Sequence, residues 1–189
     1  MEDGVMRLQI AESSAPAAIA IRLARPEDAE LLVNLVRELA IYEKREHLAN
    51  ATSADFERHL FGPRPLAEAA VAEVDGKPVA FALWFTTFST FRGHAGIYLE
   101  DLFVKPAFRG RGIGKALLAT VARLAVERGC GPLKWTVLDW NSPAIGFYRS
   151  IGAQPMEELT IYRLEDEALR RLGEKAPHPA EPRVRAGGS

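Results

Sequence analysis

Three glycines in a short basic run, Arg109-Gly110-Arg111-Gly112-Ile113-Gly114-Lys115, constrain the fold of this chain more than any other segment. The run follows an apolar, strand-like segment at 97–104 and leads into a helix-like segment from Ala116 to Arg128. Glycine lets a backbone adopt positive φ angles and approach a bulky anion closely. The helix start adds unpaired amide donors and the positive end of a dipole. Strand, turn and helix together predict a binding site for a pyrophosphate.

Two common phosphate-binding motifs do not fit this run. The Walker motif ends in Gly-Lys-Ser/Thr, whereas Lys115 is followed by Ala116. The Rossmann fingerprint is spaced G-x-G-x-x-G after the first strand of a βαβ unit, whereas these glycines are spaced G-x-G-x-G. On spacing alone, a glycine-rich turn that merely joins a strand to a helix is an equally good interpretation.

Length, charge and cysteine content narrow the class of protein. The 189 residues are enough for one domain, and a net charge of −1 gives no electrostatic footprint for nucleic acid. The single cysteine, Cys130, has no internal disulfide partner, which is typical of a reducing compartment. No apolar stretch is long enough to span a bilayer, and His94 has no second ligand at metal-binding spacing. We therefore expect a cytoplasmic protein with no membrane partner, no nucleic-acid partner and no metal.

Hydrophobic periodicity predicts one α/β domain between two tails. Residues 1–17 and 173–189 are rich in small and turn-forming residues, so we expect a disordered tail at each end of a folded domain at 18–172. Apolar patterns, caps and turn residues predict the following elements in order: a strand at 18–23, a helix at 26–42, a helix at 53–61, strands at 69–74 and 78–88, a loop at 89–96, a strand at 97–104, a helix from 116, a buried strand at 133–138, a helix capped by Ser142 that runs to about Ile151, and a last strand at 159–164. This order predicts helices layered on a mixed sheet.

A carboxylate interrupts the apolar strand before the glycine run. Glu100 and Asp101 lie in sequence within the predicted strand, so in a regular strand they point to opposite faces and at least one faces a covered side. Partial desolvation raises the pKa of a carboxyl group toward values useful for a general base. Glu100 is the candidate base, with a charge on a water-facing strand edge as the alternative.

Two motifs resemble the GNAT superfamily of N-acetyltransferases. Arg109-x-x-Gly112-x-Gly114 is similar to its acetyl-CoA signature, and Asn141 to Ala153 is similar to its Asn-x-x-Ala-x-x-Phe-Tyr motif. The resemblance implies the GNAT fold, an α/β fold with a mixed, mostly antiparallel central sheet flanked by helices. It also implies acetyl-CoA as co-substrate, Tyr148 as the acid that protonates the leaving thiolate, and an amide of Phe103 or Val104 at the thioester carbonyl. The residues implied at the coenzyme are Leu102, Phe103, Val104, Arg109, Gly110, Arg111, Gly112, Ile113, Gly114, Lys115 and Asn141.

A narrower resemblance is to the diamine (spermidine/spermine) acetyltransferase family. The segments that carry it are Tyr98 to Val104, Phe108 to Gly114, Asp139-Trp140-Asn141 with Phe147-Tyr148, and Glu38 to Glu43. It implies that Glu100 deprotonates the amine, directly or through water, and that Tyr42 and Glu43 line the amine pocket. Members of this family are dimers whose pockets draw on both subunits, so the resemblance also implies a homodimer.

The loop before the catalytic strand departs from the polyamine-acetylating members. They carry an acidic residue followed by Pro-Trp there, whereas this chain reads Thr87 to His94 with no carboxylate and with Arg92 nearby. A polycation prefers several carboxylates along its length, so the loss disfavours long polyamines. Arg92 suits the carboxylate of an amino-acid substrate, or is a solvated loop charge. Phe91 lies beside it, as packing or as a wall of the amine pocket.

We therefore expect an acetyl-CoA-dependent N-acetyltransferase acting on a small primary amine by direct transfer in a ternary complex. The amine is a diamine, a polyamine or a thialysine-like amino acid. The alternatives are a protein acetyltransferase for lysine side chains or N-termini, and a non-catalytic sensor that binds coenzyme A.

Overall fold

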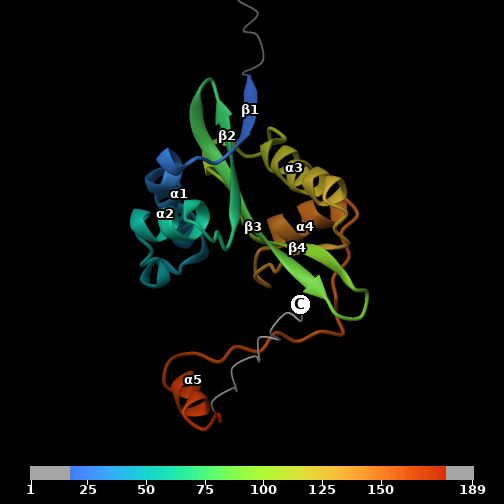
Figure 1. The fold of residues 1–189 in the computed structure, drawn as a ribbon. Helices are drawn as coiled ribbons and strands as arrows, with labels where there is room; N and C mark the ends of the chain where they lie inside the picture. Colours follow the sequence, from blue (N-terminus) through green and yellow to red (C-terminus); the bar gives the residue numbers. More distant parts are fainter. Residues whose placement is uncertain (1–17, 178–189) are drawn as a thin grey trace, which may run out of the picture. The chain divides into compact units, whose positions relative to one another are not determined.

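The structure, a computed structural model, describes residues 18–177 (Figure 1). The chain divides into two compact units, the first ending at Thr136 and the second beginning at Val137. The predicted tail at 1–17, and the part of the predicted tail beyond residue 177, lie outside the described residues.

The first unit is built on one five-stranded sheet with the strand order β1-β2-β3-β4-β5. Its first three pairings are antiparallel, and β4 and β5 are parallel. The sheet is therefore mixed and mostly antiparallel, as predicted. The strands are β1 (Ile19–Leu23), β2 (Glu68–Val74), β3 (Lys77–Ser89), β4 (His94–Val104) and β5 (Leu133–Lys134).

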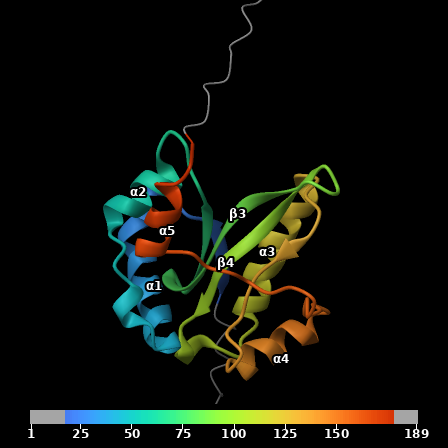
Figure 2. The same cartoon turned by 90° about the horizontal axis from the view of Figure 1, so that it is seen from below.

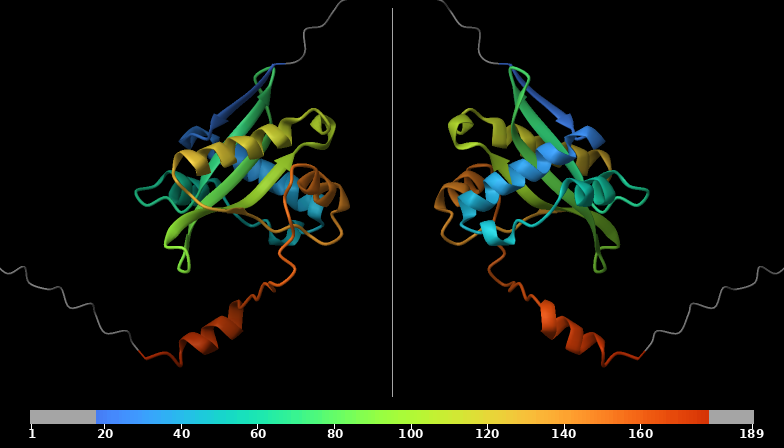
Figure 3. Two further views of the ribbon diagram at one scale, coloured as in Figure 1. Left: turned by 90° about the vertical axis from the view of Figure 1, so that its right-hand side faces the viewer. Right: turned by 90° about the vertical axis from the view of Figure 1, so that its left-hand side faces the viewer.

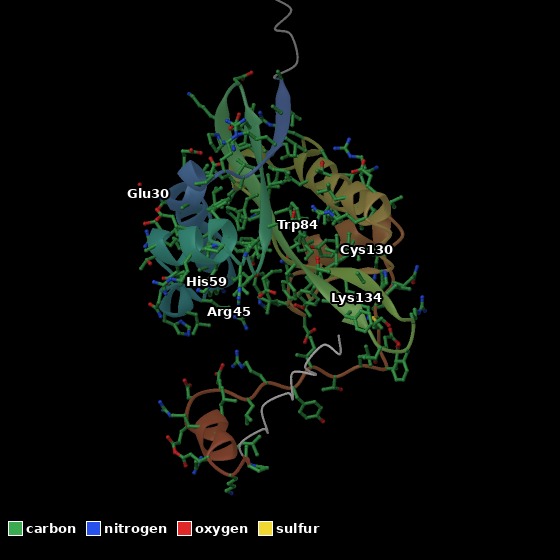
Figure 4. All side chains as sticks on the ribbon, viewed as in Figure 1. Glu30, Arg45, His59, Trp84, Cys130 and Lys134 are labelled. Carbon is green, nitrogen blue, oxygen red and sulfur yellow. The ribbon has the colours of Figure 1, made fainter. Side chains whose placement is uncertain are left out.

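Helices cover both faces of this sheet. Helices α1 (Ala29–Glu43) and α2 (Ser53–Phe61) lie on one face and α3 (Ile113–Glu127) on the other (Figures 1 and 2). Trp84, labelled on the sheet in Figure 4, is fully buried between these layers. The core on the α1 face joins side chains of α1 and of three strands, namely Leu32, Leu35, Ala69, Val71, Phe81, Leu83 and Phe103.

Local sequence signals set where the two helices on that face begin and end. Thr52 accepts a hydrogen bond from the amide of Asp55, and the Asp55 carboxylate bonds back to Thr52, which forms a capping box at the start of α2. Before α1, the Asp28 carboxylate accepts from the amide of Arg25 and from both terminal nitrogens of Arg22. Helix α1 ends at Glu43, and the next residue, Lys44, adopts a left-handed conformation with φ of 59°. This end carries Tyr42 and Glu43.

The hairpin of β3 and β4 is longer than predicted. The expected loop at 89–96 is a turn of only four residues, 90–93, because Ser89 already pairs with His94. Figure 3 shows this hairpin as a long two-stranded ribbon. Alternating side chains do not reveal where such a ribbon stops, since an exposed ribbon carries polar and apolar residues alike.

A β-bulge in β4 was also absent from the prediction. Leu83 pairs with Asp101 but its neighbour Trp84 pairs with Leu99, so Glu100 has no residue opposite it on β3. A bulge adds one residue to one strand and redirects the side chains around it.

The second unit contains α4 (Ser142–Ser150) and α5 (Asp166–Gly173). Asn141, rather than the predicted Ser142, caps α4 through a bond from the amide of Ala144 at 3.3 Å. The predicted last strand at 159–164 is wrong, because these residues form no regular element and Leu159 and Ile161 are exposed. An alternating sequence becomes a strand only when an edge pairs with it, and no described strand does so here. The predicted buried strand at 133–138 shrinks to two residues, Leu133 and Lys134, which pair with β4 but are not buried.

Candidate active site

The glycine run adopts the conformation that its sequence predicts. Gly110 and Gly112 have φ angles of 76° and 80°, in the left-handed region where a side chain is strained. Helix α3 begins at Ile113, three residues earlier than predicted, with Gly112 at its N-cap. No side chain caps this helix end within the described part of the chain. The first amides of α3 therefore remain open to an anion, and the helix dipole favours one.

The two arginines of the run turn back onto the fold. The guanidinium of Arg109 lies 4.2 Å from the centre of the Tyr42 ring, and its Nε donates to the carbonyl of Val104 at 2.9 Å. Arg111 lies 5.2 Å from the ring centre of Phe108. The aromatic contacts hold both cations beside the turn. Arg109 thus joins the end of β4 to the end of α1.

One edge of β4 is free over its second half. Strand β5 pairs with β4 only at Ile97 and Tyr98. From Leu99 to Val104 the backbone groups on that edge have no strand partner among residues 18–177. This edge leads directly into the glycine turn, so its unpaired backbone groups and the open amides at the start of α3 follow one another along the chain.

Asp101 lies on the face of the sheet that α1 covers. Its partner Leu83 belongs to the core on that face, as do Phe81 and Phe103, which pair with each other. Residues directly opposite on an antiparallel pair share a face, so the bulge leaves Asp101 directed toward α1. The expectation that at least one of the two neighbouring carboxylates faces a covered side is confirmed, and that carboxylate belongs to Asp101.

Glu100 occupies a different environment from the one predicted. It is exposed, so the expected partial desolvation of its carboxylate is wrong. Asp101 is partly buried, and burial together with the charges of Glu100 and Glu43 raises its pKa to about 7. Burial also raises the pKa of Glu43, against an opposing effect of Arg45. The alternation of the sequence indicated that one carboxylate of Glu100 and Asp101 is covered, but the bulge decides which one.

The structure brings together some of the predicted site residues and separates others. Tyr42 and Glu43 meet the end of β4 through Arg109 and Asp101. Phe91 and Arg92 lie in the turn of the β3–β4 hairpin and are exposed. Ser89 lies six residue steps along β3 from Leu83, which is about 20 Å of strand. Figures 1 and 2 show the hairpin reaching away from the end of α1, so Phe91 and Arg92 do not join the acidic group within one chain.

Asn141 and Tyr148 belong to the second unit. Asn141 is buried and caps α4, and Tyr148 lies in the last half of that helix with its ring 5.2 Å from the ring of Phe147. Within residues 18–177, no three His, Cys, Asp or Glu side chains are grouped to hold a metal ion. The helices described are all too short or too polar to cross a membrane.

Comparison with known proteins assigns the family. The sequence profile described as "Acetyltransferase (GNAT) family" matches residues 33–153. The match includes the glycine turn, the whole of β4 and the Phe147-Tyr148 pair. The chain belongs to the GNAT acetyltransferase family, and the predicted family and fold are confirmed.

Individual relatives narrow this assignment. The chain is 37% identical over 170 residues to a thialysine N-epsilon-acetyltransferase of Bos taurus, covering 84% of this chain and 99% of that protein. It is 29% identical over 197 residues to an L-ornithine N5-acetyltransferase of Arabidopsis thaliana, covering 80% of this chain and 86% of that protein. Among solved structures, an integron cassette protein of V. cholerae matches with a TM-score of 0.71 and 28% identity, covering 82% of this chain and 98% of that one.

Proposed function

We propose that this protein transfers the acetyl group of acetyl-CoA to a primary amine of a small amino acid or diamine, within a ternary complex of the two substrates. Membership of the GNAT family makes it an acetyl-CoA-dependent N-acetyltransferase. The observation that carries the proposal is the continuity of three features. The free edge of β4 connects the other two features. One end of this edge leads into the uncapped start of α3, and Asp101 on β4 faces the carboxylate of Glu43 at the end of α1.

The free edge and the glycine turn suit the two halves of coenzyme A. The amides from Gly110 to Lys115 would hold the pyrophosphate, and the exposed Lys115 adds positive charge. The pantetheine arm carries amide groups, which would pair with the backbone of Leu102, Phe103 and Val104. Arg109 would support the turn through its bond to Val104 rather than reach the phosphates directly. Asn141 would bond near the pantetheine, as the motif resemblance implies.

The chemistry needs one base and one acid. An alkyl ammonium has a pKa near 10.4, so only about one molecule in a thousand is a free amine at neutral pH. Glu100, exposed on the bulge, would accept the ammonium proton directly or through water. The amine would then attack the thioester carbonyl, whose oxygen an amide of Phe103 or Val104 would stabilise. Tyr148 would protonate the departing thiolate of coenzyme A.

Both relatives described above support an amino-acid substrate. Their names assign acetylation of thialysine and of L-ornithine, each an amino acid with a side-chain amine. The ammonium group would lie among Tyr42, Glu43 and the carboxylates of β4. A substrate carboxylate needs a cation, and Arg92 lies in the loop that carries an acidic residue in the polyamine-acetylating members.

A homodimer reconciles the position of Arg92 with this role. Phe91 and Arg92 lie at the tip of the exposed hairpin, about 20 Å along the strand from the acidic group of their own chain. Phe88 and Phe91 are 68% and 102% exposed, which is unusual for aromatic side chains and suits a protein contact. We infer that the hairpin tip of one subunit supplies Phe91 and Arg92 to the amine pocket of the other, in a cytoplasmic dimer.

The test is release of free coenzyme A from acetyl-CoA with thialysine, ornithine, lysine, putrescine, spermidine and a lysine-bearing peptide. We expect the highest kcat/KM with one of the amino acids, and a loss of about 10²-fold or more in kcat in Tyr148→Phe and in Glu100→Gln. Preference for the peptide would move the function to protein acetylation. Saturable acetyl-CoA binding with no turnover of any amine would indicate a sensor instead.

A further inference from the structure

The environment of Asp101 points to a role that no motif assigns to it. Its carboxyl lies on the α1-facing side of β4, opposite the core residue Leu83. Among residues 18–177, no amide or side chain forms a hydrogen bond or an ion pair with it. Burying a carboxyl group without a hydrogen-bond partner costs free energy, so this arrangement needs a functional explanation.

The groups around Asp101 supply negative charge and no paired cation. Glu43 faces it from the end of α1, and Glu100 adjoins it on β4. Arg45, two residues beyond the end of α1, lies 3.9 Å from Glu43 and lowers the pKa of that residue. The position opposite on β3 is the apolar Leu83.

The cations that follow β4 are engaged elsewhere. Lys105 forms an ion pair of 2.7 Å with Glu38, one α1 turn before Tyr42. Arg109 lies over the ring of Tyr42 and bonds to the carbonyl of Val104. Two cations therefore lie along the same strand end, yet both are held away from Asp101.

Resting on the proposed function, we propose that Asp101 is the anionic partner of the substrate ammonium group, and that amine binding displaces a proton from Asp101. An ammonium ion placed between Asp101 and Glu43 removes the repulsion between their charges. It also gives the unpartnered carboxylate its missing ion pair. The proton leaves Asp101 for solvent while the ammonium group remains protonated, so charge and atoms balance before Glu100 acts.

This exchange predicts a specific pH dependence of amine binding. Burial and the two neighbouring carboxylates raise the pKa of Asp101 to about 7, so below that pH a proton competes with the ammonium group. The KM for the amine then rises about tenfold for each pH unit below about 7, while the kcat at saturating amine follows other groups. Removing the charge of Glu43 lowers the pKa of Asp101, which moves the onset of this rise to lower pH.

The experiment measures initial rates at saturating acetyl-CoA with thialysine varied from pH 5.5 to 8.5. In Asp101→Asn we expect a KM that is at least tenfold higher at pH 8 and nearly constant below pH 7.5, with kcat changed only a few-fold. In Glu43→Gln the rise in KM persists but begins at lower pH, a shift that a merely structural role would not produce. Asp101→Asn with an unchanged pH-dependent rise in KM, or with a lost kcat and an unaltered KM, overturns the proposal.

A binding measurement separates this proposal from the proposed function. Calorimetric titration of thialysine into the complex of enzyme and coenzyme A, in two buffers of different ionisation heat, counts the protons released at pH 6.5. Release of more than half a proton per site in the wild type, and its loss in Asp101→Asn, supports the exchange even if thialysine proves a poor substrate. Binding without proton release in the wild type overturns the exchange while leaving acetyl transfer intact.

Discussion

The two neighbouring carboxylates of β4 differ because one residue is added to the strand. Glu100 lies on the bulge and is exposed, whereas Asp101 returns to the pairing opposite Leu83 and faces α1. If the strand were regular and kept its register from the hairpin end, Glu100 rather than Asp101 would pair with Leu83. Backbone register, rather than the identity of the side chain, therefore decides that Asp101 is the residue directed toward α1.

The raised pKa of Asp101 makes a prediction about stability. Its folded-state pKa of about 7 exceeds the reference value of 3.8, so the folded state binds the extra proton and stability falls as pH rises from about 4 to 7. Asp101→Asn removes this effect. We expect the variant to gain stability relative to the wild type by on the order of 2 kcal/mol more at pH 8 than at pH 5. Urea unfolding at both pH values measures the difference.

The control for this measurement is Asp75→Asn, which changes an exposed aspartate in the turn between β2 and β3. Asparagine tolerates the positive φ of 51° at this position. We expect no pH-dependent change there. A variant Asp101→Asn that is less stable than the wild type at pH 8 would show that the carboxylate stabilises the fold.

At the scale of elements, the turn between β4 and α3 depends on glycine for its conformation. A Cβ added at Gly112 meets no atom within 4 Å, so the obstacle to substitution is the φ of 80° alone. Gly112→Ala should cost about 1–2 kcal/mol of stability and raise the KM for acetyl-CoA, since relief of the strain displaces the first amides of α3. Thermal unfolding and acetyl-CoA kinetics measure the two effects.

Gly146→Ala is the matched control for that variant. Gly146 lies inside α4, has no positive φ, and also has open space around an added Cβ. Alanine is favoured over glycine in a helix interior by about 0.5–1 kcal/mol, so this variant should be slightly more stable and keep the KM for acetyl-CoA. Equal effects of both substitutions would show that the glycine turn has no special role in coenzyme binding.

The start of α1 depends on one buried carboxylate. Asp28 accepts from Arg22 at 2.6 and 2.9 Å and from the amide of Arg25, and the Arg22 guanidinium holds the pKa of Asp28 below its usual value. A depressed pKa stabilises the fold above the unfolded-state pKa near 4 and ceases to do so as the pH falls through the folded-state value. Asp28→Asn should therefore cost about 2–4 kcal/mol at pH 7.5 and less at pH 4.

The control variant for Asp28→Asn is Glu73→Gln. Glu73 is the second carboxylate paired with Arg22, and its side chain is more exposed than that of Asp28. We expect a smaller loss, about 1 kcal/mol, because water partly replaces the bond. Urea unfolding at the two pH values separates the cases. A larger loss in Glu73→Gln than in Asp28→Asn would assign the stabilisation to the sheet rather than to the helix start.

Across the whole molecule, the features that depend on neighbouring residues could be predicted from the sequence. The features that depend on pairing between distant strands could not. The helix at 53–61 and the left-handed glycine turn at Gly112 follow from neighbouring residues, and both agree with what the sequence predicts. The bulge at Glu100 depends on the register between two strands, and the strand expected at 159–164 depends on a partner edge. Neither can be deduced from the segment itself, which is why the covered carboxylate was assigned to the wrong neighbour.

The proposed exchange of hairpin tips between subunits makes a prediction that only an assembly can satisfy. Tyr148→Phe and Arg92→Ala should each be nearly inactive with thialysine when assayed alone. Co-expression at equal levels gives hybrid dimers as half of the population, and each hybrid has one site with both the native tyrosine and the partner's native arginine. About a quarter of all sites, and of the wild-type activity, should therefore return. If both residues instead act within one chain, no hybrid site is complete and the activity stays at the level of the single variants.

Light scattering of the purified mixture confirms that dimers are present. Phe88→Asp tests whether the hairpin aromatics hold the dimer together, and Val126→Asp, on the exposed face of α3, is its control.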